Sequence, residues 1–334
     1  MQLFTLGFLH MINGFEDAPV LVKDFLSYMQ TIKGKSINTV QVYLYDLRVF
    51  LRFIKLHKKL VPEDTDFDSI DISDVDENLL KSVTLSDLYS YMSFVSNSRS
   101  NSVYARARKV ASLKSFYKYL TNKAKVLDVN PAQELESPKI IKRLPRYLNI
   151  EESKKLLSSV DGKFSARDYA ILTLFLNCGL RLSELVGINL NNIKNNTLRV
   201  IGKGNKERVI PLNSACIEAI NNYMKERPVE GVTDKNALFL SERRQRISKA
   251  TVQHIVKKYI ISAGLDPRRY STHKLRHTAA TLMYKYGHVD IRTLQKLLGH
   301  ESIATTEIYT HLDDQQLQNA VESNPLANFN PAKR

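Results

Sequence analysis

Hydrophobic residues recur every three or four positions through much of the first half of the chain. This spacing places them on one face of an α-helix and predicts an amphipathic helix wherever it persists. It persists over four segments, which run from Val22 to Ile32, from Val40 to Ile54, from Thr84 to Ser96 and from Ser102 to Thr121. The first half is therefore expected to be all helical.

The pattern changes in the second half. A helix is predicted to start at Asn149, and an apolar helix is predicted over Tyr169–Cys178. Two β-like runs, Leu198–Ile201 and Arg208–Leu212, flank the segment Gly202–Lys206, whose glycines are typical of a hairpin turn. The second half is thus expected to be mainly helical with a small β-hairpin.

A basic segment that contains prolines separates the two halves. Pro131, Pro138 and Pro145 interrupt the helical pattern there, because proline disfavours helix in the residue that precedes it. We place the boundary near residue 140, with a helical N-terminal domain over residues 1–140 and a C-terminal domain over residues 141–334. A chain of 334 residues is long enough for two domains that each bury a core.

The chain is strongly basic. It has 49 Lys and Arg against 34 Asp and Glu, a formal net charge of +15 at pH 7, and its hydrophobic content of 43% is that of a folded protein. Twelve basic and three acidic residues lie between Arg99 and Arg146, interleaved with aromatic residues. Such a surface attracts polyanions, so nucleic acid is the expected partner, although a solvated helix with core-facing aromatics has the same pattern.

Other segments mainly exclude functions. The eight acidic residues between Glu63 and Glu77 predict a solvated loop, because the turn glycine and closing glutamate of a calcium loop are absent. Cys178 and Cys216 are too few for a disulfide framework or a structural zinc site, which favours a reducing, cytoplasmic location. The apolar run Leu3–Ile12 is too short for a membrane span, and no basic residue precedes it. Met11 is an alternative start of the protein.

Six scattered residues in the second half suit attack on a phosphodiester: Arg181, Lys203, His273, Arg276, His300 and Tyr309. Two guanidinium groups can bind the non-bridging phosphate oxygens and neutralise the charge of the transition state, as metal ions do in other nucleases. A lysine can protonate the departing oxygen, and a tyrosine becomes a competent nucleophile once a histidine takes its proton. No metal is expected, because no carboxylate cluster accompanies these residues. No nucleotide cofactor is expected either, because a phosphotyrosine ester conserves the energy of the broken bond.

These residues lie in five ordered sequence pieces that together resemble the tyrosine recombinase (phage integrase) family, and its Xer-type members most closely. The pieces are Gly179–Leu185, Ile201–Arg208, His273–His277, Leu297–His300 and Tyr309–His311. The resemblance covers residues 18–327. It implies a two-domain DNA clamp, with a helical, SAM-like core-binding domain and an α-rich catalytic domain.

The resemblance also implies roles for the six residues. Arg181 and Arg276 match the phosphate-binding arginines. Lys203 matches the general acid on the hairpin, with Lys206 as a second candidate. Tyr309 matches the nucleophile.

The remaining roles are supporting ones. His273 resembles the histidine that helps to activate the tyrosine, His300 the one that hydrogen-bonds the scissile phosphate, and Glu184 the acidic residue that orients the first arginine. The basic segment adds the expected DNA-binding residues, which are Arg106, Arg108, Lys109, Lys114, Lys142 and Arg143.

Simpler interpretations exist for some of these residues. His273 and His277 stand four apart, as in a zinc pair, but the glutamate of the H-E-x-x-H motif is absent and Arg276 would lie beside the cation. His277 itself is interpreted as a structural or surface residue. The glycines around Lys203 lack the spacing of a nucleotide-binding P-loop.

As a function, the resemblance implies a site-specific recombinase that cuts duplex DNA at inverted-repeat half-sites through a 3′-phosphotyrosyl intermediate and a Holliday junction. Chromosome dimer resolution is expected, since no arm-binding domain fits ahead of residue 18. The expected assembly is a homotetramer, or a heterotetramer with a paralogue, joined by a C-terminal helix over residues 312–326; a DNA translocase is a candidate activator. The alternatives are a mobile-element integrase or excisionase, a type IB topoisomerase and a catalytically idle DNA-binding regulator.

Overall fold

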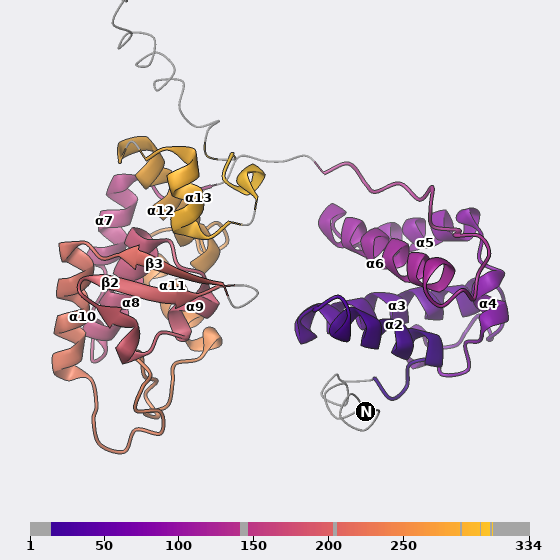
Figure 1. Cartoon of the computed structure of the whole chain (residues 1–334), viewed down its shortest axis with the longest axis horizontal. Coiled ribbons are helices and arrows are strands. Elements are labelled where there is room, and N and C mark those ends of the chain that lie inside the picture. Colours follow the sequence, from indigo (N-terminus) through magenta and orange to yellow (C-terminus); the bar gives the residue numbers. More distant parts are fainter. Residues whose placement is uncertain are drawn as a thin grey trace, which may run out of the picture. The chain divides into compact units, whose positions relative to one another are not determined.

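The computed structural model describes residues 15–140, 146–202, 206–287, 289–300, 302–307 and 309. The chain separates into two compact units, residues 1–142 and residues 143–334 (Figure 1). Each unit has its own cluster of buried hydrophobic residues. That each unit has its own task stays a prediction.

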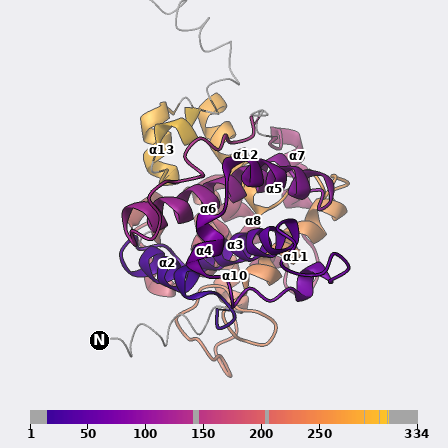
Figure 2. The same cartoon turned by 90° about the vertical axis from the view of Figure 1, so that its right-hand side faces the viewer.

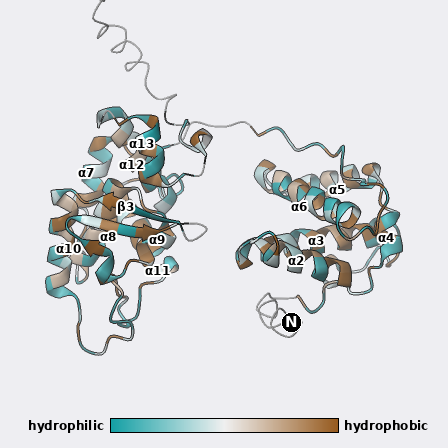
Figure 3. Ribbon diagram, viewed as in Figure 1, coloured by the Kyte–Doolittle hydropathy of each residue, from teal (hydrophilic) through white to brown (hydrophobic). Residues whose placement is uncertain are grey.

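The first unit is a bundle of helices. The described elements are α2 (Val20–Thr31), α3 (Ile37–His57), the 3-10 turn η1 (Phe67–Ser69), α4 (Glu77–Lys81), α5 (Leu85–Asn97) and α6 (Val103–Asn122). The longest described helix, α3, contacts the helices α2, α5 and α6, and every described helix of the bundle carries both hydrophobic and hydrophilic residues (Figure 3). The four long helices begin and end close to the segments in which the sequence shows helical periodicity.

Local caps explain where two of these helices begin. Thr84 precedes α5, and its hydroxyl accepts the N–H of Asp87, whose carboxylate accepts the N–H of Thr84 in return. Ser102 precedes α6 and accepts the N–H of Ala105. Such caps satisfy backbone N–H groups that have no partner inside the helix.

Aromatic residues fill the core of the first unit. Phe25 meets Phe116 edge-on with ring centroids 5.3 Å apart, and Phe50 meets Tyr91 at 5.2 Å. Phe116 and Tyr117 are fully buried, so the aromatic residues of α6 that alternate with basic ones belong partly to the core. This observation favours, for these two rings, the core-facing interpretation of the pattern.

The acidic segment is less solvated than the sequence predicts. Ile70, Ile72 and Val75 are buried, and the ammonium of Lys55 donates to both carboxylate oxygens of Asp74 at 2.7 and 2.8 Å. The prediction of a solvated loop over residues 63–77 is therefore wrong in part. Isolated apolar residues among eight acids do not show a periodic pattern, yet they are enough to anchor the segment to the bundle.

The second unit surrounds a central helix, α8, which contacts α7, α10, α11 and α12. Its helices are α7 (Ile150–Ser158), α8 (Ser165–Cys178), α9 (Leu182–Val186), α10 (Ser214–Glu226), α11 (Lys249–Ser262), α12 (Thr272–Tyr286) and α13 (Ile291–Leu298), with the 3-10 turns η2 (Leu190–Asn192) and η4 (Ile303–Thr305). Figures 1 and 2 both place α13 beside α12.

A small antiparallel sheet lies in the same unit, in the order β1-β2-β3. Strand β2 (Thr197–Ile201) pairs with β3 (Glu207–Pro211), with Leu198 opposite Ile210, and both of these residues are buried. Strand β1 (Ile193–Lys194) has only two residues, too few for a sequence pattern. The expected fold class, mainly helical with a small sheet, is confirmed.

No helix among the residues described has the length and apolar character needed to cross a bilayer.

Candidate active site

Gly179 makes the turn that opens the site. It ends α8 with φ of +59°, a conformation that residues with a side chain rarely adopt. A Cβ at this position would lie 2.8 Å from Cδ2 of Leu298, so the Leu298 side chain would have to shift. The chain therefore turns sharply after α8, and Arg181 precedes α9 directly after this turn.

Glu184 is the centre around which three arginines gather. Its carboxylate is 1% exposed and accepts Nη1 of Arg181 at 2.8 Å and two nitrogens of Arg208 at 2.6 and 2.9 Å. Nη1 of Arg276 lies 3.8 Å away. Burial alone would raise the pKa of Glu184, but hydrogen bonds from Arg208 and from Arg181 outweigh it and lower the pKa. The carboxylate thus stays ionised and holds the guanidinium groups in place.

Arg276 lies deep in the same cluster. It is 4% exposed, and it donates to the carbonyls of Gly179 and Leu298, each at 2.6 Å. Burial and then the charge of Arg181 lower the pKa of Arg276 to about 10, which leaves it cationic at neutral pH. Because a guanidinium has five N–H donors, these two bonds leave others that can bind a phosphate.

A groove of about 700 Å³ opens beside these residues. Arg181 and His300 both line this groove. Nη2 of Arg181 donates to the carbonyl of Gly299, the residue before His300, at 2.7 Å. Lys203 lies outside the described residues, but Gly202 and Lys206 on either side of it line the same groove. The hairpin and the end of α13 therefore meet at this groove.

His300 is held within the groove by its own loop. Its Nδ1 lies 2.9 Å from the hydroxyl of Thr306, and its backbone carbonyl accepts from the side chain of Gln295 at 3.1 Å. Burial first, and then the charges of the neighbouring arginines, lower the pKa of His300 to about 4. The ring is therefore neutral at neutral pH and can offer a hydrogen bond without an added charge.

Tyr309 is buried, and its hydroxyl contacts a histidine. The residue is 1% exposed, and Oη lies 2.7 Å from Nδ1 of His277. His273, which we expected to help activate the tyrosine, meets the other side of the His277 ring instead, with the two Nε2 atoms 3.1 Å apart. Burial raises the pKa of Tyr309 to about 12, although the charge of Arg276 opposes the rise.

The structure thus brings six predicted residues into one region. They are Arg181, Glu184, Arg276 and His300, together with Tyr309 and His273, which both contact His277. Two participants were missed. Arg208 was part of a quoted sequence piece but received no role, and His277 was interpreted as structural. Neither has a signal in sequence spacing, because their partners Glu184 and Tyr309 lie 24 and 32 residues away.

The DNA-binding residues expected in the first unit differ in exposure. Arg106 donates to Ser96, and Lys114 is exposed and donates to a backbone carbonyl. The prediction that Lys109 binds DNA is not supported by its position. Its side chain is 2% exposed, and its ammonium donates to the buried Asp46 at 2.9 Å, so it is not available to a phosphate. Lys142 and Arg143 lie outside the described residues.

Arg108 has an intermediate position. It donates to Asp46 at 2.5 Å, like Lys109, but 40% of its side chain is exposed. A guanidinium has enough N–H groups to bond this carboxylate and a phosphate together.

Within the described ranges, no group of three His, Cys, Asp or Glu side chains could hold a metal ion. The His273–His277 pair accordingly has no third ligand of these types there.

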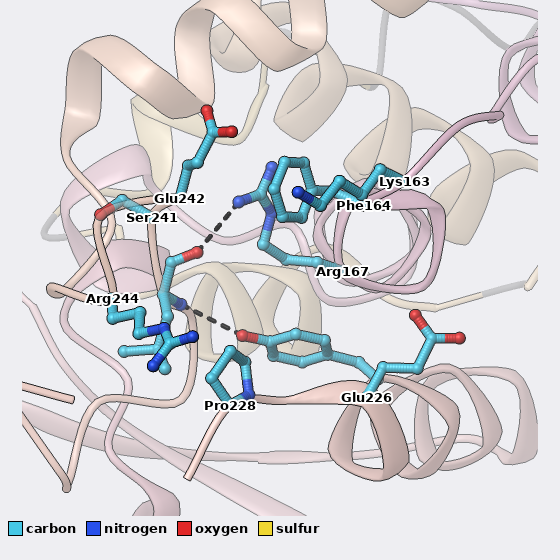
Figure 4. Close-up of a pocket in the computed structure, with 10 residues that line it drawn as sticks. Lys163, Phe164, Arg167, Glu226, Pro228, Ser241, Glu242 and Arg244 are labelled. Atoms are coloured by element: carbon cyan, nitrogen blue, oxygen red, sulfur yellow. Dashed lines mark hydrogen bonds between the residues drawn. The ribbon is translucent and has the colours of Figure 1, made fainter. Parts of the chain in front are cut away.

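A second pocket, of about 270 Å³, lies near the start of α8 (Figure 4). Its lining includes Lys163, Arg167, Glu242 and Arg244, and Arg167 donates to the carbonyl of Leu240 at 3.0 Å. Opposite charges are mixed in this lining, and it contains none of the residues predicted for catalysis. The groove at Arg181 is the candidate active site.

The site suits an anion whose charge increases during reaction. Two arginines fixed by carbonyls and by Glu184 need no reorganisation to bind such a group, and this is the arrangement that stabilises a transition state electrostatically. A phenol lies nearby as a potential nucleophile. A phosphodiester fits both features.

Comparisons with known proteins agree with this chemistry. The profile of the Phage integrase family matches residues 146–316. The chain is 63% identical over 309 residues to "Tyrosine recombinase XerC" from Caldanaerobacter subterraneus subsp. tengcongensis, covering 92% of this chain and 88% of that protein. It is 35% identical over 313 residues to "Tyrosine recombinase XerD" from Proteus mirabilis, covering 92% and 93%.

Solved structures share the fold. A XerH site-specific recombinase bound to palindromic difH substrate, in a post-cleavage complex, matches with a TM-score of 0.67 and 23% identity over 91% of this chain and 95% of that one. A dimer of a lambda integrase fragment bound to a COC′ core site matches with a TM-score of 0.62 and 16% identity, over 85% of this chain and 96% of that one.

Proposed function

The chain belongs to the tyrosine recombinases of the phage integrase family and is an Xer-like site-specific recombinase, and we propose that it resolves chromosome dimers through a covalent intermediate on Tyr309. The observation that carries this proposal is the fixation of Arg181 and Arg276 by one buried carboxylate, Glu184, beside a groove that His300 lines. This arrangement binds a phosphate and leaves it open to a nucleophile.

In the proposed reaction, the two arginines bind the non-bridging oxygens of the scissile phosphate, and His300 donates a further hydrogen bond. Oη of Tyr309 attacks phosphorus, which gives a 3′-phosphotyrosyl ester and releases the 5′-oxygen. Lys203 protonates that oxygen, with Lys206 as the alternative donor. Because the ester retains the energy of the broken bond, a second 5′-hydroxyl can reverse the step on another strand.

The first unit is proposed to bind the duplex, as the core-binding domain of the family does. Arg106, Arg108 and Lys114 are the candidates among the described residues, whereas the buried ammonium of Lys109 does not reach the surface. Lys142 and Arg143, in the segment between the units, remain proposals. Contacts of this kind supply salt-dependent affinity rather than sequence specificity.

The assembly is proposed to be a tetramer on two inverted-repeat sites, formed by one chain or with a paralogue. The proposed docking helix over residues 312–326 lies outside the described residues. Activation by a DNA translocase and action on chromosomal DNA in the cytoplasm complete the proposal, which rests here on the resemblance to Xer proteins.

The test is a trap for covalent adducts. Protein and Tyr309→Phe are incubated in EDTA with sheared genomic DNA from the source organism, denatured in detergent, and the attached DNA is sequenced. Adducts at one chromosomal inverted repeat, absent from the variant, are expected. Adducts at the ends of a mobile element would favour an integrase, and scattered adducts a type IB topoisomerase. Binding without any adduct would point to the idle regulator and contradict the proposal.

A further inference from the structure

Three side chains of the second unit form a continuous hydrogen-bonded row that ends at the nucleophile. Oη of Tyr309 lies 2.7 Å from Nδ1 of His277, and Nε2 of His277 lies 3.1 Å from Nε2 of His273. The two histidines stand one turn apart on α12, with ring centroids 4.6 Å apart and planes at 82°. One imidazole therefore stands between the phenol and the histidine that the sequence assigns to it.

Each contact in this row holds one proton, which limits the tautomers. If the phenol donates to Nδ1 of His277, the neutral ring carries its own proton on Nε2 and donates it to His273. His273 then accepts at Nε2 and carries its proton on Nδ1. In this arrangement every donor points away from Tyr309, which is the direction a proton must take when the phenol becomes a nucleophile.

We propose that His277 is the catalytic residue that accepts the proton of Tyr309 during strand cleavage, with His273 as the second member of a relay. The proposal rests on the recombinase function proposed above. As the bond from Oη to phosphorus forms and the bond to the 5′-oxygen breaks, the phenolic proton moves to Nδ1 of His277. The proton on Nε2 moves to His273, and the leaving oxygen takes its proton from the proposed acid, Lys203.

The surroundings keep this acceptor unprotonated before DNA binds. Burial first, then the charges of His273, Lys274, Arg276 and His300, lower the pKa of His277 to about 4. The His277 ring is therefore neutral throughout the neutral range, and in the tautomer described above its Nδ1 is free to accept a proton. A bound phosphodiester brings negative charge to the arginines of this cluster, and an opposite charge raises the basicity of a nearby histidine. The base is thus strengthened when its substrate arrives.

His277 has an alternative role that the same contact allows. It could restrain Tyr309 in a buried position, so that its removal would release the nucleophile. The two roles predict opposite changes in the rate of cleavage, since loss of a base slows the reaction and loss of a restraint accelerates it.

The experiment measures single-turnover formation of the covalent adduct on a nicked duplex carrying the site recovered by the trap, in EDTA, from pH 6 to pH 9. His277→Asn keeps a hydrogen-bond acceptor near the position of Nδ1 but is not basic. His277→Ala leaves space that added imidazole can fill. The matched control is His254→Asn, at an exposed histidine on α11. Affinity for the uncleaved duplex shows that each variant is folded.

A general base contributes a factor of about 10² to 10⁴, so His277→Asn is expected to slow the adduct by that factor while His254→Asn matches the wild type. Hydroxide must then replace the base, so the rate of His277→Asn should rise about tenfold per pH unit, whereas the wild-type rate stays nearly level. Imidazole should restore part of the rate of His277→Ala.

The relay would be overturned if His277→Asn formed the adduct at the wild-type rate and with the wild-type pH profile. It would also be overturned if His277→Ala formed the adduct faster than the wild type. A wild-type protein that forms no adduct on any duplex would overturn the recombinase function itself, together with the relay that depends on it.

Discussion

Arg208 makes a bidentate hydrogen bond to the carboxylate of Glu184, with Nη1 2.6 Å from Oε1 and Nη2 2.9 Å from Oε2. Its Nε also donates to the carbonyl of Leu297 at 2.8 Å. A single side chain on β3 thus joins the hairpin to α9 and to the end of α13, just before His300. Arg208 itself lines the groove, together with Lys296 and His300. Because its described contacts go to Glu184 and to a backbone carbonyl, we expect it to act as a positioning residue.

Arg208→Lys is expected to slow adduct formation and to lower the free energy of unfolding by about 1–3 kcal/mol, because an ammonium cannot make the two-pronged contact. Chemical unfolding and single-turnover cleavage check both effects. Arg199→Lys, on the neighbouring strand, is the matched control, since Arg199 is half exposed and its contact to Glu207 is 3.5 Å long. Equal effects of the two substitutions would show that the bidentate contact between Arg208 and Glu184 contributes neither to stability nor to the rate of cleavage.

Glu184→Gln is expected to destabilise the second unit by about 3–5 kcal/mol at pH 7, because it leaves buried guanidinium groups without their counter-charge. The pKa of Glu184 is lowered from its ordinary value of 4.5, so its contribution is present above that value and is lost as the pH falls through the lower, folded-state pKa. The difference in unfolding free energy between wild type and variant should therefore shrink below about pH 4. A difference that does not change with pH would contradict this.

Gly179→Ala is expected to cost more stability than Gly34→Ala, although both glycines have φ of +59°. A Cβ at Gly34 meets nothing within 4 Å, so this substitution reports backbone strain alone, about 1 kcal/mol. At Gly179 the added atom would lie 2.8 Å from Leu298, whose carbonyl holds Arg276. Comparison of the two unfolding midpoints, together with cleavage rates, measures the difference. Equal midpoints would mean that Leu298 moves aside without cost.

Substitutions of Lys109 and Lys114 are expected to affect different properties, the first the stability of the protein and the second its affinity for DNA. Lys109→Met should lower the stability of the first unit by about 3 kcal/mol, because Asp46 is buried and loses one of its two cationic partners. Lys114→Gln should leave stability unchanged and reduce the salt dependence of DNA affinity by about one unit of slope. Titrations of binding at several salt concentrations, beside chemical unfolding, separate the two residues. A smaller slope for Lys109→Met would restore Lys109 to the DNA-binding surface.

Sequence reasoning succeeded where the information is local. Helical periodicity marked α3, α5, α6 and α8, and glycines around Lys203 marked the hairpin. It failed where a few residues act through tertiary contacts. The acidic segment was predicted to be solvated from its charges, but it is anchored by Ile70, Ile72 and Val75, which are buried. On α6, Lys109 cannot be distinguished by sequence from its exposed neighbours, because its burial depends on the contact with Asp46 on α3.

The sequence by itself determined the residue types that the chemistry needs and their order along the chain, because the spacing of Arg181, His273, Arg276, His300 and Tyr309 is a property of the chain alone. Only the tertiary structure decided which of them touch. Arg208 and Glu184 are 24 residues apart, and His277 and Tyr309 are 32 apart, so no periodic pattern links either pair. Their contacts arise because α12 packs against α8 and α13, and α13 packs against β3, and such packing depends on the whole fold rather than on any segment.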